Sequence, residues 1–198
     1  RVHRIYCLLK LNFRRKGKQR LPVRNPAPLA TPEAMNQSWS IDFMHDALVC
    51  GRCFRIFNVV DDFNREALAI EIDLNIPAQR VVRVVANRGY PLKMRMDNGP
   101  ELISLTLAQW AEEHDVMLDF IKPGKPTQNA FIERFNRTYR TEILDFYLFR
   151  TLNEVREITE RWLTEYNSER PHESLNNLTP EEYRLMTENS EVSKSAWN

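Results

Sequence analysis

The chain has 198 residues and a mass of 23.5 kDa, the size of one compact domain with a short extension. Apolar residues make up 42% and charged residues 28%, which excludes a disordered or fibrous protein. No apolar run reaches about 18 residues, so we expect no transmembrane helix, and we find no signal peptide. Arg1 rather than Met begins the chain, which suggests a fragment. Three cysteines indicate a reducing cytoplasm rather than a disulfide framework.

Charge is segregated along the chain, although the net charge is only +1. Residues 1–30 contain nine of the 28 Lys and Arg and none of the 27 Asp and Glu, so this segment carries +9 and the remainder −8. Its densest part is the block Arg14, Arg15, Lys16, Lys18 and Arg20. Such a block is typical of polyanion binding, because each neutralised phosphate releases counterions. A solvated arm without a ligand is the alternative.

The first 35 residues do not resemble the rest of the chain. Apolar residues cluster on one helical arc in 1–20, and the sequence then becomes basic. Residues 21–35 contain four prolines, which stiffen the chain and block helix and sheet, so we expect a linker there. The main domain is predicted over 36–190.

Within that domain, strand patterns precede helix patterns. Alternating or β-branched runs predict an antiparallel three-strand meander over 39–45, 54–60 and 67–74. Pro77 begins a valine-rich helical segment that ends at Gly89, and short strands follow at 93–96 and 117–121 on either side of a helix at 102–114. Further helices are predicted over 129–146, 153–168 and 180–187. This order predicts an α/β fold of the ribonuclease H type, a mixed five-stranded sheet with helices on both faces.

Three carboxylates are candidates for metal-dependent chemistry. Asp42 lies inside the first strand, Asp97 ends the fourth, and Glu133 lies in a helix. A carboxylate inside a strand is costly unless it is paired or binds a metal, and converging carboxylates repel unless a cation neutralises them. Mg²⁺ prefers oxygen ligands and is commonly shared with phosphates, and two ions about 4 Å apart support in-line phosphoryl transfer.

The helix that carries Glu133 has two unlike faces. At about 100° per residue, polar residues fall near Glu133, and apolar residues fall opposite it. The polar set is Asn129, Asn136, Arg137 and Arg140, and the apolar set is Phe131, Ile132, Phe135, Tyr139 and Ile143. An acid, two amides and two arginines on one stripe suit metal and phosphate binding better than plain solvation.

Three ordered motifs resemble the catalytic core of DDE transposases and retroviral integrases. These are Trp39-x-x-Asp42-Phe, Asp97-Asn-Gly-Pro-Glu and Gln128-Asn-x-x-x-Glu133-Arg-Phe-Asn, with 35 residues between Asp97 and Glu133 and a basic residue, Arg140, seven beyond the glutamate. Downstream, Tyr166-Asn-Ser-Glu-Arg-Pro-His172 and Thr179-Pro resemble the bacterial insertion-sequence-3 transposase family. The resemblance extends over nearly the whole chain.

This resemblance implies a function for each motif. Asp42, Asp97 and Glu133 would be the catalytic triad and would bind two Mg²⁺, for which Mn²⁺ can substitute, to nick insertion-sequence ends and join a DNA 3′-hydroxyl to target DNA. DNA would be the partner of a homo-oligomer on paired ends, away from membranes, in the bacterial cytoplasm at the nucleoid. Residues 1–20 would be the end of a truncated helical DNA-binding region. The implied DNA contacts are Arg140, Arg137, Asn136, Asn129, Lys125, Arg14, Arg15, Lys16, Lys18 and Arg20.

Two other functions remain open from the residues. A nuclease of the same fold would cut strands without joining them. An inactive DNA-binding remnant is the second alternative, because the segment from Ile76 to Gly89 is shorter than its counterparts in the family. Other motifs have simpler interpretations: Cys50-Gly-Arg-Cys53 suits a hairpin turn, Asp61 and Asp62 suit a turn at a strand end, and His172 suits either a loop-fixing hydrogen bond or a catalytic role.

Overall fold

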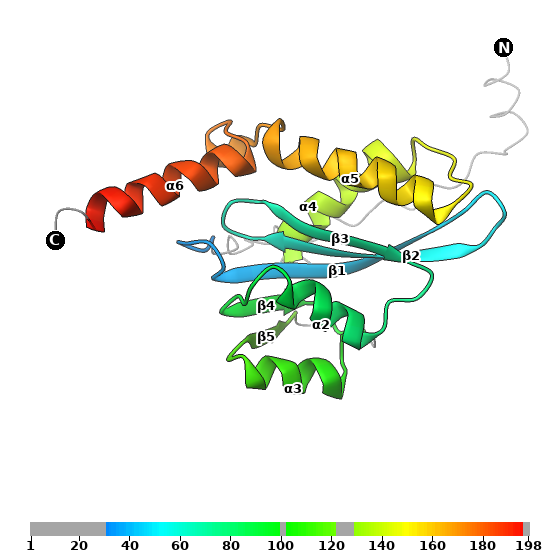
Figure 1. Cartoon of the computed structure of the whole chain (residues 1–198), viewed down its shortest axis with the longest axis horizontal. Helices are drawn as coiled ribbons and strands as arrows, with labels where there is room; N and C mark the ends of the chain where they lie inside the picture. The colour runs from blue at the N-terminus through cyan, green and yellow to red at the C-terminus, as the bar shows by residue number, and fades with distance from the viewer. Residues whose placement is uncertain (1–30, 100–101, 122–128, 196–198) are drawn as a thin grey trace, which may run out of the picture.

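A computed structural model describes residues 31–99, 102–121 and 129–195. Five strands form one sheet in the order β3-β2-β1-β4-β5 (Figure 1). Their bounds are β1 Ser38–Ala47, β2 Cys53–Asp61, β3 Ala67–Asp73, β4 Lys93–Met96 and β5 Met117–Phe120. The first three strands pair antiparallel, and β1, β4 and β5 run parallel. The predicted meander and mixed sheet are therefore confirmed.

Helices cover both faces of this sheet (Figure 1). The helical elements are α2 Ala78–Ala86, α3 Leu105–Glu113, α4 Ala130–Tyr139, the π-helical η2 Arg140–Leu144, α5 Leu152–Ser168, the 3₁₀ turn η3 Glu173–Leu175, and α6 Pro180–Ser195. In the residues that the structure describes, no helix is long and apolar enough to cross a membrane. The ribonuclease H-like α/β prediction is confirmed in its sheet, its crossovers and its helical layers.

Strand alternation sends successive side chains of β1 to opposite layers. Trp39 and Ile41 are fully buried in an apolar cluster under α2 and α3. The other layer lies under α4 and α5, where Ile132, Phe135 and Trp162 pack on β2. Asp42 faces this second layer, since it alternates with Ile41 and contacts α4. The fold thereby places one carboxylate of the sheet against the helix that carries Glu133.

Helix boundaries differ from the prediction where capping or packing decides them. Ser104 caps α3 by accepting a hydrogen bond from Leu107 N at 3.2 Å, so this helix begins later than predicted. The predicted helix over 129–146 is an α-helix followed by a π-helical turn that begins at Arg140. The last helix continues to Ser195 rather than ending at 187.

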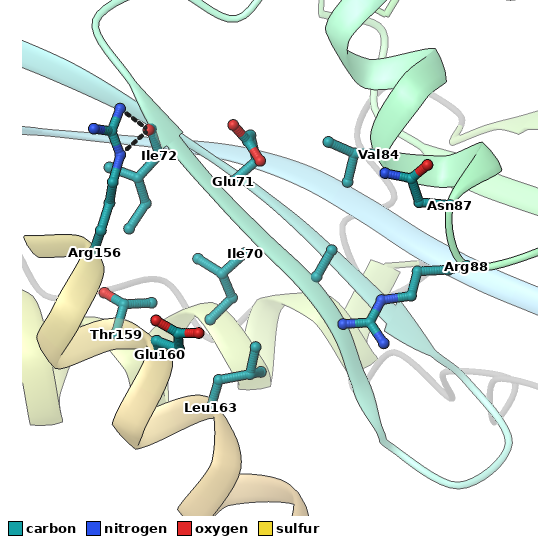
Figure 2. Close-up of a pocket in the computed structure, with 11 residues that line it drawn as sticks. Ile70, Glu71, Ile72, Val84, Asn87, Arg88, Arg156, Thr159, Glu160 and Leu163 are labelled. Atoms are coloured by element: carbon teal, nitrogen blue, oxygen red, sulfur yellow. Dashed lines mark hydrogen bonds between the residues drawn. The ribbon is translucent and has the colours of Figure 1, made fainter.

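The edge strand β3 is protected by α5. Figure 2 shows Arg156 donating from Nε and Nη2 to the backbone carbonyl oxygen of Ile72, at 3.1 and 2.9 Å. This contact occupies a carbonyl group on an edge that could otherwise pair with another strand. A cavity of about 370 Å³ lies beside it, lined in part by Arg88 and Glu160.

Candidate active site

Asp42 occupies the centre of the candidate site, on the middle strand of the sheet. The Phe43 backbone N–H donates to its Oδ1 and the Asn136 side-chain Nδ2 donates to its Oδ2, each at 2.8 Å. Asn136 in turn accepts from Asn58 Nδ2 at 2.7 Å, and Asn58 lies directly across the β1–β2 ladder from Asp42. A chain of hydrogen bonds therefore joins β2, α4 and β1 and fixes the Asp42 carboxylate.

The three predicted carboxylates are electrostatically coupled. Burial raises the pKa of Asp42 to about 6, although the Phe43 N–H lowers it, and the negative charges of Asp97 and Glu133 raise it further. The Asn136 hydrogen bond acts in the opposite direction. Asp97 and Glu133, which are 55 and 91 positions further along the chain, thus both act on the Asp42 carboxyl group. The fold therefore places Asp97 and Glu133 near enough to Asp42 for their charges to act on it.

Asp97 follows β4 directly, level with Asp42. The parallel pairing of β1 and β4 sets Ser40 opposite Arg95, so two residues further along each strand come Asp42 and Asp97. Asp97 Oδ1 accepts from the Gly99 backbone N–H at 3.0 Å, which fixes the turn after the strand. Its side chain is half-buried. Asp97, at the carboxyl end of β4, is therefore at the register position beside Asp42 of the neighbouring parallel strand β1.

Glu133 lies in the first turn of α4 and is exposed. It is three residues before Asn136, so both side chains project from neighbouring positions of one helix toward the Asp42 side. Ile132, Phe135 and Tyr139 are buried and hold this helix on the sheet. The apolar face of α4 thus fixes where Glu133 lies.

Oxygen donors from three carboxylates suit Mg²⁺, and the raised pKa of Asp42 indicates a cluster that a cation would stabilise. Among the described residues, however, no group of three Asp, Glu, His or Cys side chains is close enough to form a metal site. The three carboxylates therefore have the chemistry of ligands for a divalent cation. In the structure, however, they are not close enough together to bind one ion jointly.

The predicted DNA contacts lie in different environments. Asn136 is buried and bridges Asp42 and Asn58. Asn129 is also buried, and its Oδ1 finds no hydrogen-bond partner within the part of the chain that is described. Arg137 is exposed. Of these three residues, the structure therefore connects Asn136 to a candidate carboxylate by a hydrogen bond.

Arg140 lies against the end of β1. Its Nη2 donates to the His45 carbonyl oxygen at 2.9 Å, and its Nη1 lies 3.4 Å from Asp46 Oδ2. Its Nη1 also lies 3.6 Å from Asp145 Oδ1, and the side chain remains 39% exposed. Lys125, Arg14, Arg15, Lys16, Lys18 and Arg20 lie outside the described residues, and their DNA contacts remain predictions.

Sequence reasoning missed two groups beside the carboxylates. Asn58 is a fully buried amide in an apolar strand, an anomaly visible in the sequence Phe57-Asn58-Val59. Asp62 lies in the predicted turn and is also fully buried: it accepts from Ser38 Oγ at 2.9 Å and pairs with Arg95 Nη1 at 3.2 Å. Asp61 does form the turn, since its Oδ1 accepts from the Phe63 N–H at 2.8 Å.

The predicted hairpin turn at Cys50-Gly51-Arg52-Cys53 is also confirmed. The Gly51 backbone N–H donates to the Leu48 carbonyl oxygen at 2.7 Å, and Gly51 adopts φ 82°, a conformation that favours glycine. Both cysteines are exposed, and neither belongs to a metal site among the residues described.

Comparison with known proteins shows the family and the fold of this chain. Two integrase core domain models match residues 32–126 and 114–180. A protein of insertion element IS407 from Burkholderia multivorans is 43% identical over 187 residues, covering 92% of this chain and 68% of the relative. A protein of IS476 from Xanthomonas euvesicatoria is 37% identical, covering 92% and 54%. The putative transposase InsK of IS150 from Escherichia coli is 28% identical, covering 77% and 56%.

Solved structures share the fold. The simian T-cell lymphotropic virus intasome, in complex with a PP2A regulatory subunit, contains a chain that aligns at a TM-score of 0.64 with 17% identity, covering 75% of this chain and 54% of that one. The HTLV-2 integrase catalytic core domain in complex with magnesium aligns at 0.55 with 14% identity, covering 75% and 96%. At these identities the likeness supports the ribonuclease H-like fold and no more.

Proposed function

Since this chain belongs to the integrase-core family of insertion-sequence DDE transposases, we propose that it nicks insertion-sequence ends and joins their 3′-hydroxyls to target DNA with Mg²⁺ as cofactor. Proteins of this family act in transposition by polynucleotidyl transfer. The observation that carries the proposal is that the charges of Asp97 and Glu133 act on a half-buried Asp42 whose orientation α4 fixes.

Asp42, Asp97 and Glu133 would hold two divalent cations. When bound, such a pair supplies positive charge beside the attacking and leaving oxygens of an in-line displacement at phosphorus. Donor chemistry supports this assignment, and the similar HTLV-2 integrase core was solved with magnesium. Each Asp42 oxygen accepts one hydrogen bond in the protein and keeps lone-pair capacity for another ligand.

Asn136 orients Asp42 in this proposal. It donates to the carboxylate and accepts from Asn58, so the direction of its amide is determined by two partners. Hydrogen bonds that fix a metal-binding side chain commonly affect metal affinity or activity by about 10–100-fold. Asn136 therefore acts as a positioning residue rather than as a contact to DNA bases.

Positive side chains near the cluster would hold the DNA backbone. Arg137 lies one helical turn beyond Glu133 and is exposed, and the Arg140 side chain is 39% exposed. Guanidinium groups bind phosphates through paired N–H donors. The basic block from Arg14 to Arg20 would add sequence-independent affinity.

The test compares Glu133→Gln with the wild-type chain on DNA that carries element ends, with Mg²⁺ and with EDTA. Glu157→Gln is the matched control, because Glu157 is an exposed helical glutamate outside the cluster. We expect cleavage and joining in the wild type and control only with Mg²⁺, and neither in Glu133→Gln. Equal activity of Glu133→Gln and wild type would overturn the assignment of the triad.

A branched DNA that mimics the joined product tests strand transfer separately. Transesterification is reversible, so the enzyme should resolve the branch without recognising element ends. Resolution of the branch and joined products on linear DNA indicate a transposase. Cut strands without joining indicate a nuclease of the same fold, and DNA binding without either reaction indicates an inactive remnant.

A further inference from the structure

A second polar cavity lies on the opposite side of α4 from Glu133. Its volume is about 360 Å³, within the range of small-ligand sites. Phe131, Arg134 and Thr138 line it from α4, and their helical positions fall on the face away from Glu133 and Arg137. The rest of its wall comes from the β2–β3 turn, the end of α5 and the loop after it. The cavity is therefore separate from the carboxylate cluster.

Cationic groups from three parts of the chain converge on this cavity. They are Arg65 from the β2–β3 turn, Arg134 from α4 and Arg170 from the loop after α5. Arg170 is already paired, since its Nη1 and Nη2 donate to the two Glu142 carboxylate oxygens at 2.8 and 2.7 Å. Arg134 is exposed and forms no ion pair with described residues. Two of the three guanidinium groups thus remain available for an anion, and Glu173 is the one acidic residue in the described lining.

Arg65 is held at the cavity by an unusual backbone. Its φ of 62° is in the left-handed region, which a non-glycine residue rarely adopts. Its guanidinium stacks on the Phe131 ring at 3.6 Å from the centroid. Burial lowers the pKa of Arg65, the nearby charge of Asp62 opposes this, and Arg134 lowers it further. The fold therefore keeps the positive charges of Arg65 and Arg134 near each other.

Two buried polar atoms at the cavity have no hydrogen-bond partner among the residues described. They are Arg65 Nη1 and His172 Nε2. Burial lowers the pKa of His172 to about 4, and the positive charges of Arg170, Arg134 and Arg65 contribute. His172 is therefore neutral near pH 7. Buried polar groups are nearly always paired. Arg65 Nη1 can pair only with an acceptor, and His172 Nε2 can donate to the same acceptor in one neutral tautomer.

We propose that this cavity is an anion site that binds a phosphate group of DNA through Arg65 and Arg134, with the His172 imidazole as an additional hydrogen-bond donor. Oxygens of a phosphate match the paired N–H donors of arginine. Phe131 and Tyr166 add an apolar wall that strengthens this attraction by excluding water. The cavity is larger than one phosphate, which leaves room for an attached sugar. DNA as the source of the phosphate rests on the proposed function, whereas the anion site itself does not.

The test measures DNA affinity by fluorescence anisotropy in EDTA, so that catalysis and metal binding do not enter. Arg134→Gln should weaken binding about tenfold and reduce the slope of log K against log salt by about one, as expected for one lost phosphate contact. Arg88→Gln is the matched control, because Arg88 is an exposed arginine that lines the cavity of Figure 2. Its affinity should change less than twofold. If Arg134→Gln and Arg88→Gln changed DNA affinity equally, DNA would not be the source of the phosphate bound in this cavity.

Arg65→Gln and Arg65→Lys sharpen the test. The lysine variant keeps the charge but loses the paired donors, so its affinity should lie between that of wild type and Arg65→Gln. Arg65 is partly buried, and thermal melting checks that these variants fold. If they do not fold, Arg134→Gln decides the question, because Arg134 is exposed.

Inorganic phosphate distinguishes the two sources of the anion. Saturable phosphate binding, followed by calorimetry and lost in Arg134→Gln together with DNA affinity, supports a DNA phosphate. Phosphate binding lost in Arg134→Gln with unchanged DNA affinity supports the anion site and overturns DNA as its source. No difference from wild type with either probe overturns the site. These results are independent of Glu133→Gln, so failure of the triad assignment would be seen separately.

Discussion

The two faces of the central sheet both carry an apolar core, but only one of them includes buried polar groups beside the candidate site. Under α2 and α3, the strand residues Trp39, Ile41 and Met94 form a wholly apolar layer. Under α4 and α5 the layer is also largely apolar, but polar strand residues interrupt it: Asp42 and Asn58 are joined there through Asn136 of α4. The first face stabilises the fold by removing apolar surface from water. The second face also holds Asp42, whose raised pKa shows that its charge is disfavoured there, at the position where the proposed reaction would use it.

Asp42→Asn should have the largest effect on activity of these substitutions while leaving the free energy of unfolding almost unchanged. We expect activity to fall by at least about a thousandfold, as for loss of a residue acting within a catalytic unit. The free energy of unfolding at pH 8 without divalent ions should be unchanged or higher, because the raised pKa of Asp42 shows that its charged form is disfavoured in the fold. Activity assays and urea unfolding of the same preparation test this. A marked loss of stability would contradict the view that the fold holds the charged Asp42 at a cost.

Phe57→Ala should give the opposite result. Phe57 is fully buried under α2 and α3 and packs on Phe43 with ring centroids 5.0 Å apart. Its truncation should lower the free energy of unfolding by about 3–5 kcal/mol, measured by urea unfolding. Activity per folded molecule should remain within a few-fold of wild type. A loss below about 1 kcal/mol would show that this face does not carry the stability assigned to it.

Asn136→Ala should affect both properties. It leaves Asp42 and Asn58 each without one partner, so we expect activity to fall about 10–100-fold and stability to fall by about 1–3 kcal/mol. Steady-state rates at several Mg²⁺ concentrations measure the first effect, and extra Mg²⁺ should restore part of it. Asn153→Ala, at an exposed amide of α5, is the control. A stability change without any shift in Mg²⁺ dependence would make Asn136 merely structural.

The smallest predicted effect concerns pH and His172. Its folded-state pKa of about 4 lies below the ordinary 6.5, so the folded protein binds this proton less readily than the unfolded chain. The stability of wild type relative to His172→Gln should be constant above pH 6.5 and fall as pH decreases toward 4. Allowing for partial exposure, we expect a loss of about 1–2 kcal/mol. A relative stability that does not change with pH would contradict the assigned environment.

The free energy of unfolding at each pH must be compared between wild type and His172→Gln, because the wild type alone also reports other titrating groups. Burial raises the pKa of both Asp42 and Asp61 to about 6, so their ionisation lowers stability as pH rises through roughly the same range. These contributions are common to wild type and His172→Gln and cancel in the difference.

Sequence reasoning succeeded where the signal was local. The alternation of β1 to β3 predicted the meander, and Pro77 indicated the start of α2. It placed Asn129 and Asn136 on one stripe with Glu133 but did not show that both amides are buried. A helical wheel gives the angle of a side chain but not what packs beside it, and here β1 and β2 cover Asn136.

The amino-acid sequence by itself determined the order of strands and helices, the family motifs and the identity of three candidate carboxylates, because periodicity and spacing are properties of neighbouring residues. Only the tertiary structure decided that Asn58 reaches Asp42 through α4, and that Arg65, Arg134 and His172 surround one cavity. These groups lie far apart in the chain, and their burial and charge interactions exist only after the sheet and helices have packed.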